Sequence, residues 1–244
     1  MPVLAIDTAT ATCSIAIGKD GEVAGEATFA AGRSHLELLL PSIDRLLADC
    51  GFDREQLDSI IVGTGPGTFS GLRVGIATAR AMSQALILHL AGSGSLNALA
   101  AGLMEAGGAT GAESLLPVID ARRGQVFARL FSLANAGKPV PQSEIMCLSP
   151  GDLLSRLKAE RRTRVLAAGD GVQQYHSLFS AASGVEVPCV DDDAHLIKAR
   201  FHLPPAGATR GYDFAGLLDV TPVYVREPDA DKTVLLRKRE PWLE

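Results

Sequence analysis

The sequence predicts an α/β protein with two lobes, each built on a mixed sheet flanked by helices. Three observations predict this: apolar runs of strand length alternate with helical patterns, 25 glycines mark many tight turns, and an apolar run ending in Ile-Asp occurs at residues 3–7 and again at 116–120. Such alternation is typical of α/β folds, and the recurring order of elements indicates an internal duplication. The alternative, that any two α/β units share this order, stays open. We place the lobes at residues 1–106 and 107–244, with an extended tail near 220–244.

Strands and a hairpin open the first lobe. Residues 3–6, 13–17 and 22–29 are runs of strand length, and the Gly-bounded segment 18–21 predicts a hairpin turn between the last two. A buried strand is expected at residues 60–62, because this short run is wholly apolar. The first lobe should therefore hold antiparallel strands beside a strand that follows its first helix.

That first helix is expected over residues 34–50. Ser34 and Glu37 have the S-x-x-E spacing of a capping box, and Gly51 is placed to end the helix in the left-handed conformation. Helical spacing predicts one apolar face, formed by Leu36, Leu39, Leu40, Ile43, Leu46 and Leu47. A long second helix should cover residues 70–88.

A third helix is expected at residues 95–104, and residues 105–114, rich in Gly and Ala, predict the link between the lobes. The second lobe then repeats the opening pattern. It should have a hairpin tip at residues 122–124, a second strand at 125–133 and a helix at 152–160.

The end of the chain gives weaker patterns. A strand at residues 165–168 and a glycine loop at 169–171 are followed by residues 191–216, which predict irregular chain with one short helix. Residues 220–232 read as a strand-like extension before a polar terminus.

The glycine-rich segment at residues 63–75 joins a strand to a helix, where backbone N–H groups can bind an anion. It has no Gly-Lys-Ser/Thr end, so it is not a Walker A loop. Counted from Gly65, the third glycine of a dinucleotide fingerprint is replaced by Thr68, and no acidic residue occurs between Asp58 and Glu105 to bind a ribose. Both nucleotide-binding interpretations of this loop therefore fail.

Small residues line one stripe of the second helix. Gly71, Gly75, Ala79 and Ser83 are four residues apart, so another backbone can approach this stripe closely. The stripe either packs against the chain's own sheet or pairs with a second subunit, and spacing alone favours neither.

The sequence offers no catalytic or metal constellation. No two histidines are four apart, and there is no G-x-S-x-G elbow. The cysteines are too far apart for a zinc or redox motif, and read as reduced, mostly buried thiols. The histidines are His35, His89, His176, His195 and His202, and the cysteines are Cys13, Cys50, Cys147 and Cys189. We interpret His35 as a first-turn helix residue or as a contact near a partner.

Two aspartates end the first strand of each lobe. Asp120 fits a turn-forming residue that bonds the backbone after it. Asp7, followed by Thr8, is either the remnant of a nucleotide contact or a second turn-forming aspartate. Arg122 and Arg123 at the hairpin tip are either solvated turn residues or a docking contact for carboxylates or phosphates.

Charge and hydropathy narrow the class of protein. The net charge is −5, so a basic stripe that would bind nucleic acid by itself is not expected. The basic group at Lys158, Arg161, Arg162 and Arg164 reads as a solvated helix end. The start lacks a basic region, and no long uncharged apolar stretch occurs. We therefore expect a cytoplasmic protein without a membrane span.

Several ordered motifs together resemble the TsaB family, also called YeaZ. The most specific is the loop from Gly65 to Gly71. The others are Ile6-Asp7-Thr8 with Cys13-Ser14, Arg33-Ser34-His35 with Leu40-Pro41, Ile119-Asp120-Ala121-Arg122-Arg123-Gly124, Gly169-Asp170-Gly171 and Pro222-Val223-Tyr224-Val225-Arg226. The resemblance spans nearly the whole chain, and residues 191–216 depart from it.

The resemblance implies an actin-like ATPase (ribonuclease H-like) fold and a role in synthesis of threonylcarbamoyladenosine in tRNA. Proteins of this family are expected to be scaffold or activator subunits without activity of their own. They bind a TsaD-type sister subunit and a TsaE-type small ATPase, or form homodimers through the same first two helices. The resemblance thus implies a partner interface at His35, Leu38, Gly71, Arg73, Gly75, Ala79 and Ser83. No cofactor is expected on the chain alone, ATP or ADP is expected at the joint surface, and tRNA is reached only through the complex.

A second class of function stays open. Branches of this superfamily are also labelled glycoprotease-like peptidases, and small-molecule kinases share the fold. A peptidase needs a metal or nucleophile group, and a kinase needs a catalytic carboxylate, for which Asp7 is the candidate. ATP hydrolysis or metal-dependent proteolysis by the purified chain would separate these from a binding subunit.

Overall fold

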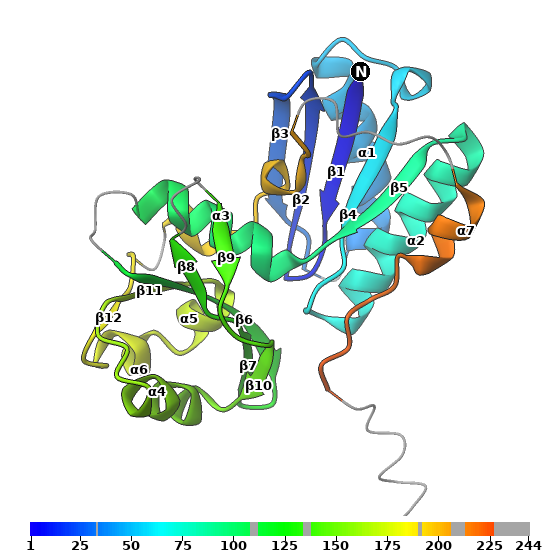
Figure 1. Cartoon of the computed structure of the whole chain (residues 1–244). Coiled ribbons are helices and arrows are strands. Elements are labelled where there is room, and N and C mark those ends of the chain that lie inside the picture. The colour runs from blue at the N-terminus through cyan, green and yellow to red at the C-terminus, as the bar shows by residue number, and fades with distance from the viewer. Residues whose placement is uncertain (33, 108–111, 134–137, 190–191, 206–212, 227–244) are drawn as a thin grey trace, which may run out of the picture.

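The computed structural model describes residues 1–32, 34–107, 112–133, 138–189, 192–205 and 213–226. These residues form two mixed sheets, one at the upper right and one at the lower left of Figure 1. Helix α3 (Ser95–Gly107) leads from the first sheet to the second and packs against strands of the second.

The first sheet has the order β3-β2-β1-β4-β5. Its strands are β1 (Pro2–Asp7), β2 (Thr12–Lys19), β3 (Glu22–Ala30), β4 (Ser59–Gly63) and β5 (His89–Ser93). The first three strands are antiparallel neighbours, whereas β1–β4 and β4–β5 are parallel pairs. Asp20 and Gly21 both have positive φ, 54° and 89°, which is the geometry of a tight hairpin turn. The predicted hairpin and mixed sheet are confirmed.

The second sheet repeats this arrangement. Its path is β10-β7-β6-β11-β12, in which β6 pairs antiparallel with β7 and parallel with β11. These strands are β6 (Ser114–Arg122), β7 (Gln125–Ala128), β10 (Met146–Leu148), β11 (Val165–Ala168) and β12 (Val185–Glu186). Off this path, β8 (Phe131–Leu133) pairs with β6, and β9 (Pro139–Pro141) pairs with β8. Along this path the order and direction of the strands match the first sheet, as an internal duplication predicts, while β8 and β9 are additional.

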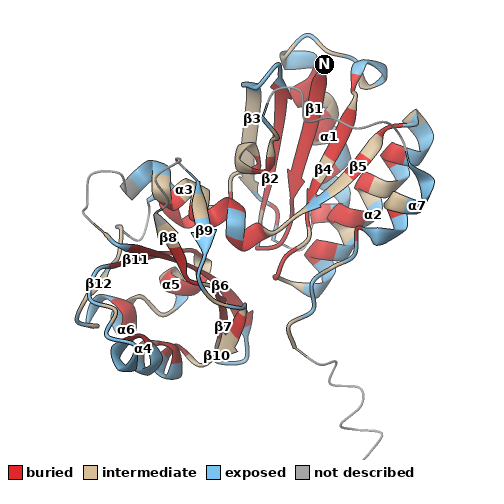
Figure 2. Cartoon of the chain, in the orientation of Figure 1, coloured by how far each residue is buried: buried red, intermediate tan, exposed pale blue. Residues whose placement is uncertain are grey.

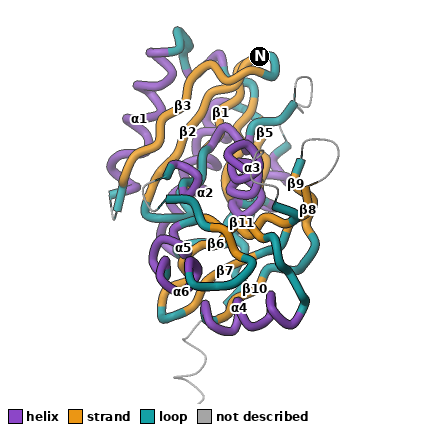
Figure 3. Tube along the Cα trace, turned by 90° about the vertical axis from the view of Figure 1, so that its left-hand side faces the viewer, coloured by secondary structure: helices purple, strands orange, loops and turns teal. Residues whose placement is uncertain are grey.

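The helices and short turns complete the chain and appear from the side in Figure 3. They are α1 (His35–Asp49), η1 (Arg54–Gln56), α2 (Phe69–Leu86), α4 (Pro150–Ala159), α5 (Asp170–Gln174), α6 (His176–Ser180), η2 (Asp193–His195), η3 (Ala199–His202) and α7 (Phe214–Asp219). In the described part of the chain no helix has the length and apolar character to cross a membrane.

Both faces of the first sheet are covered. Leu4 and Ile6 of β1 lie in one core cluster with side chains of α1 and α2, whereas Ala5 packs with Ala16 and with Ala199 of η3. Alternate residues of a strand point to opposite faces, so α1 and α2 cover one face and η3 covers the other. Figure 2 shows the central strands buried along their length.

The start of α1 differs from the expected capping box. The Ser34 side chain makes no capping bond, because its backbone has ψ of 21° rather than an extended value. The Ser34 carbonyl instead accepts from the N–H groups of Glu37 and Leu38, at 3.1 and 3.0 Å. The predicted end is confirmed, since Gly51 has φ of +75°.

Other boundaries shift for local reasons. Helix α2 ends at Leu86 instead of residue 88, because Ile87 is left-handed with φ of 56°. Helix α3 runs to Gly107, so part of the expected link is helical. Residues 220–226 form no strand, and the rest of the expected 220–232 extension lies outside the described residues. The backbone of Val223 pairs with Thr64 through one hydrogen bond of 2.8 Å, which is too little to make a ladder.

Candidate functional site

The glycines of the loop and of α2 allow close packing within the chain. A Cβ atom on Gly67 would lie 2.3 Å from the Ala9 carbonyl oxygen, and one on Gly71 would lie 2.1 Å from that of Thr8. A Cβ atom on Gly75 would meet Thr8 Oγ1 at 2.2 Å. Thr8 Oγ1 also donates to the Gly71 carbonyl, at 2.8 Å. The start of α2 is therefore seated on the residues that follow β1.

This packing settles where the small-residue stripe lies. Gly71, Gly75, Ala79 and Ser83 are all buried in the chain, and Ser83 Oγ donates to the Leu88 carbonyl at 2.8 Å. The chain's own residues cover this stripe, as the internal-packing alternative expects, and its implied place in a partner interface stays a prediction. A bulky residue at Gly75 would therefore disturb the fold itself.

Asp7 lies at the centre of a buried hydrogen-bond network. Its Oδ1 accepts from the Ala9 N–H at 2.8 Å, and its Oδ2 accepts from Ser95 Oγ at 2.7 Å and from His202 Nε2 at 2.9 Å. Asp7 is 2% exposed. Three of its roughly four acceptor positions are used inside the protein and the side chain is closed to solvent, so the residues present do not fit the expected nucleotide contact of Asp7 and Thr8.

Exposed leucines distinguish the start of α1. Leu36 is 74% exposed, Leu38 39% and Leu40 38%, although Ile43 and Leu47 farther along the helix are buried. Leu36, Leu40, Ile43 and Leu47 follow one helical stripe, so the apolar face extends beyond what this chain covers. Leu36 and Leu40 of the predicted apolar face are therefore exposed at the start of the helix. His35 is buried, and its Nε2 lies 3.1 Å from the Thr10 carbonyl oxygen, which makes it a first-turn structural residue.

A cavity of about 580 Å³ opens between the start of α2, the β6–β7 hairpin and the segment at residues 223–226. Its residues include Phe69, Asp120, Arg122, Tyr224 and Arg226. It brings together the glycine loop and the two hairpin arginines that the sequence singled out separately. Segment 223–226 contacts α2 through Arg73, whose Nε donates to the Tyr224 hydroxyl at 3.3 Å, and the chain just before it is tied to α2 by Arg80, which donates to the Val220 carbonyl at 2.6 Å.

The hairpin tip has the expected turn geometry. Asp120 Oδ1 accepts from the Arg122 N–H at 2.9 Å, and Oδ2 forms an ion pair with the Arg122 guanidinium at 3.0 Å. Arg122 and Arg123 both have positive φ, 60° and 55°. The turn-forming role of Asp120 is confirmed.

Two buried groups have shifted pKa values. Burial raises the pKa of Asp170 to about 6; the Asp120 N–H, which donates to its carboxylate, lowers this pKa, the Asp120 charge raises it and Arg122 lowers it. The Asp170 carboxylate accepts the Asp120 N–H at 2.9 Å. Burial, with a smaller effect from Asp7, raises the pKa of Cys13 to about 12, so this thiol is not a nucleophile at neutral pH.

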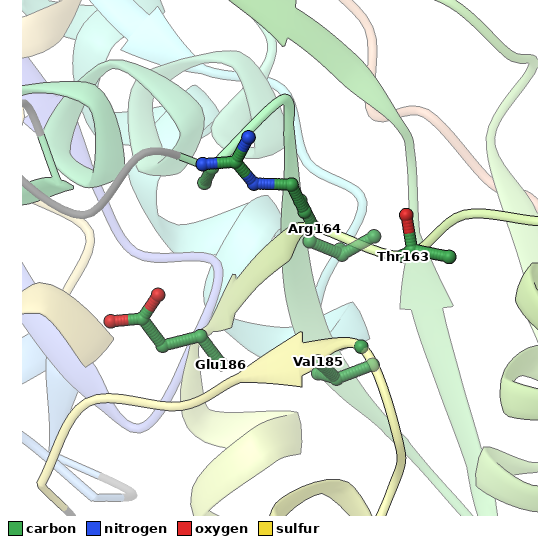
Figure 4. Close-up of a pocket in the computed structure, with 7 residues that line it drawn as sticks. Thr163, Arg164, Val185 and Glu186 are labelled. Atoms are coloured by element: carbon green, nitrogen blue, oxygen red, sulfur yellow. The ribbon is translucent and has the colours of Figure 1, made fainter.

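A smaller hollow of about 220 Å³ lies at the β11–β12 edge. Figure 4 shows Thr163 and Arg164 on one side and Val185 and Glu186 on the other. Arg164 pairs with Glu113 at 3.4 Å, and both side chains are exposed. The basic group here is a solvated helix end, as expected. Across the residues that the structure describes, no cluster of three metal-ligating side chains occurs.

Sequence reasoning missed Ser95, His202, Phe69 and Tyr224. Ser95 and His202 lie 88 and 195 residues from Asp7, and no local pattern joins them to it. The exposed aromatic pair could have been noticed, because Phe69 interrupts a glycine loop in a chain with only 5% aromatic residues.

Comparisons with known proteins agree with this architecture. Residues 29–138 match the family model described as TsaD, tRNA N6-adenosine threonylcarbamoyltransferase. A Bacillus subtilis relative, "tRNA threonylcarbamoyladenosine biosynthesis protein TsaB", is 32% identical over 188 residues, which cover 76% of this chain and 78% of the relative. The Escherichia coli protein of the same name is 35% identical over 127 residues, 52% of this chain and 53% of its own length.

A comparison with solved structures agrees with these sequence relatives. The structure of YeaZ from Pseudomonas aeruginosa matches with a TM-score of 0.72 and 25% identity, and covers 92% of this chain and 99% of its own. The expected actin-like ATPase fold, with mixed sheets flanked by helices, is confirmed. The chain belongs to the TsaB family.

Proposed function

We propose that this chain is a non-catalytic scaffold and activator subunit in synthesis of threonylcarbamoyladenosine in tRNA. In this role it binds a TsaD-type transferase. Its relatives are named for that biosynthesis, which supports the process. The observation that carries the binding role is the exposed leucine stripe at the start of α1, where Leu36 is 74% exposed on the same face as buried Ile43.

The exposed part of this apolar stripe is typical of a protein–protein interface. Its burial against a partner would contribute roughly 25 cal/mol to the binding free energy per Å² of apolar surface. Leu38 and Arg73 are exposed in the same region of α1 and α2. Of the residues that the resemblance implied for the interface, these two are available on the surface. A second copy of the chain would use the same face, so homodimer and heterodimer compete.

A catalytic role for this chain alone has little support. A kinase of this fold would need a free carboxylate near the phosphates, and Asp7 is occupied by Ala9, Ser95 and His202. We therefore assign the transfer chemistry to the sister subunit. Binding of ATP or ADP at the joint surface, and recruitment of a TsaE-type ATPase, belong to the assembled complex.

Leu36→Glu tests the proposal. A charge on the stripe should abolish co-elution with the TsaD-type transferase and reduce tRNA modification by the mixture about tenfold or more. Since Leu36 is mostly exposed, the melting temperature of the monomer should not change. The matched control is Leu178→Glu on α6, where the leucine is 50% exposed outside this face.

Two results would contradict the proposal. One is tRNA modification or steady ATP hydrolysis by the purified chain without its partner. The other is unchanged co-elution of the Leu36→Glu variant, which would place the interface elsewhere.

A further inference from the structure

The cavity between α2 and the β6–β7 hairpin concentrates positive charge in an acidic protein. Three arginines, Arg122, Arg123 and Arg226, line it together with one carboxylate, Asp120, although the chain as a whole has a net charge of −5. Fields from clustered charges in a hollow attract ligands of the opposite sign. The cavity therefore favours an anion.

Aromatic rings lie at the same cavity. The ring centroids of Phe69 and Tyr224 are 5.7 Å apart, and the rings are tilted by 32°. The Arg73 guanidinium lies 3.7 Å from the Phe69 ring centroid, and its Nε donates to the Tyr224 hydroxyl at 3.3 Å. Phe69 is 55% exposed and Tyr224 50%, so ring surface stays open to a further planar group.

Arginines beside exposed aromatic rings are typical of sites for unpaired nucleotides, in which a base stacks on a ring and a phosphate meets a cation. We propose that this cavity binds a nucleotide of single-stranded RNA, with its base on Phe69 and Tyr224 and its phosphates near Arg122 and Arg226. The inference rests on the proposed function, which brings the chain beside a tRNA.

The groups around the cavity favour a nucleotide within a strand over a free nucleoside triphosphate. A triphosphate is normally bound with Mg²⁺, which prefers carboxylate oxygens. Asp7 is buried and holds three donors, and Asp120 is paired with Arg122. Stacking and one phosphate contact need neither carboxylate.

The test is fluorescence anisotropy of the full chain with a labelled ten-nucleotide single-stranded RNA at low salt. Tyr224→Ala should weaken binding on the order of tenfold, since stacking on one aromatic side chain has about that effect. Arg226→Ala should also weaken it and should lower the slope of log affinity against log salt by roughly 0.7, the value for one phosphate of a single strand. Phe214→Ala on α7 and Arg156→Ala on α4 are matched controls outside the cavity, and both should bind like the wild type.

Three outcomes would overturn the inference. They are no measurable binding of RNA by the wild-type chain, equal weakening by the control variants, and displacement of the RNA by free ATP at equal concentration. The last outcome would make the cavity a site for free nucleotides.

Co-elution with the TsaD-type transferase is measured in parallel for the wild type and for the Tyr224→Ala and Arg226→Ala chains. If the wild type co-elutes while RNA binding fails, the RNA inference alone is wrong. If the wild type does not co-elute, the proposed function is wrong as well.

Discussion

His202 and Ser95 hold the Asp7 carboxylate in a place without access to water. Both donate to the same Oδ2 atom, and the Ala9 N–H donates to Oδ1. In a catalytic triad the histidine bridges the carboxylate and the nucleophilic serine. Here Ser95 and His202 both bond Asp7 directly, so the three residues do not form a triad. The three side chains come from β1, α3 and η3, so the network ties distant segments of the chain to the end of the first strand.

His202→Ala should destabilise the protein by about 2–4 kcal/mol. The substitution leaves a buried carboxylate with one partner fewer and opens a cavity where the side chain was fully enclosed. Urea unfolding measures the difference. His176→Ala on α6 is the control, because its bond to Ser180 is exposed and should be worth less than about 0.5 kcal/mol. A His202→Ala chain as stable as the control would show that the network carries no stability.

The sequence shows which residue types occur at a strand end, but not which distant groups meet them. The strand ending at Asp7 was predictable from its apolar run, and so was the turn role of Asp120, which involves a residue two positions away. His202 lies in a stretch without helical or alternating periodicity, and its role depends on η3 returning to the first sheet. Such contacts are set by the tertiary fold.

At the scale of elements, α2 ends in a strained conformation. Ile87 has φ of 56° and ψ of 47°, a left-handed backbone that suits glycine and disfavours a β-branched side chain. Ile87 is 70% exposed, so its burial contributes little stability to offset the backbone strain.

Ile87→Gly should therefore stabilise the protein by roughly 0.5–1 kcal/mol, because relief of the left-handed strain exceeds the added chain entropy. Thermal unfolding would show a higher midpoint. Ala85→Gly, at an exposed position inside the same helix, should lower stability by about 1 kcal/mol. A loss of stability in both variants would mean that Ile87 makes contacts that matter more than its backbone.

Periodicity predicted that α1 and α2 exist, and composition marked their ends to within a few residues. Neither pattern could show that the apolar stripe of α1 is buried at Ile43 and exposed at Leu36. Burial of each residue depends on how far the neighbouring elements extend along the helix. The small-residue stripe of α2 raised the same question, and the close contact of Gly75 with Thr8 answered it within the chain.

At the scale of the whole molecule, two sheets of the same strand order meet at a shared cluster. Ala9 and Leu72 of the first half pack with Ile119 and Phe127 of the second, together with Leu99 of α3. The repeated order was predictable from the two Ile-Asp strands. The shared cluster was not predictable, because its residues are scattered over both halves of the sequence and share no pattern.

Asp170 makes the stability of the molecule depend on pH in an unusual direction. It lies at the start of α5 beside Asp120, and burial raises its pKa from 3.8 to about 6 in the folded protein. The folded state then binds the proton more tightly than the unfolded state between these values. Its contribution to stability is greatest below about pH 4, falls as the pH rises to about 6, and stays low above that.

Asp170→Asn isolates this effect, since asparagine can still accept the Asp120 N–H and has no charge to bury. The stability of the variant relative to the wild type should rise between pH 4 and pH 7.5 by up to about 3 kcal/mol, roughly two pKa units at 1.4 kcal/mol each. Urea unfolding at a series of pH values measures it. Asp219→Asn, at an exposed end of α7, is the control, and its difference from the wild type should change by less than about 0.5 kcal/mol over the same range. A constant difference for Asp170→Asn would mean that the carboxylate is hydrated in the folded protein, and that the joint between β6 and α5 is more open than its burial indicates.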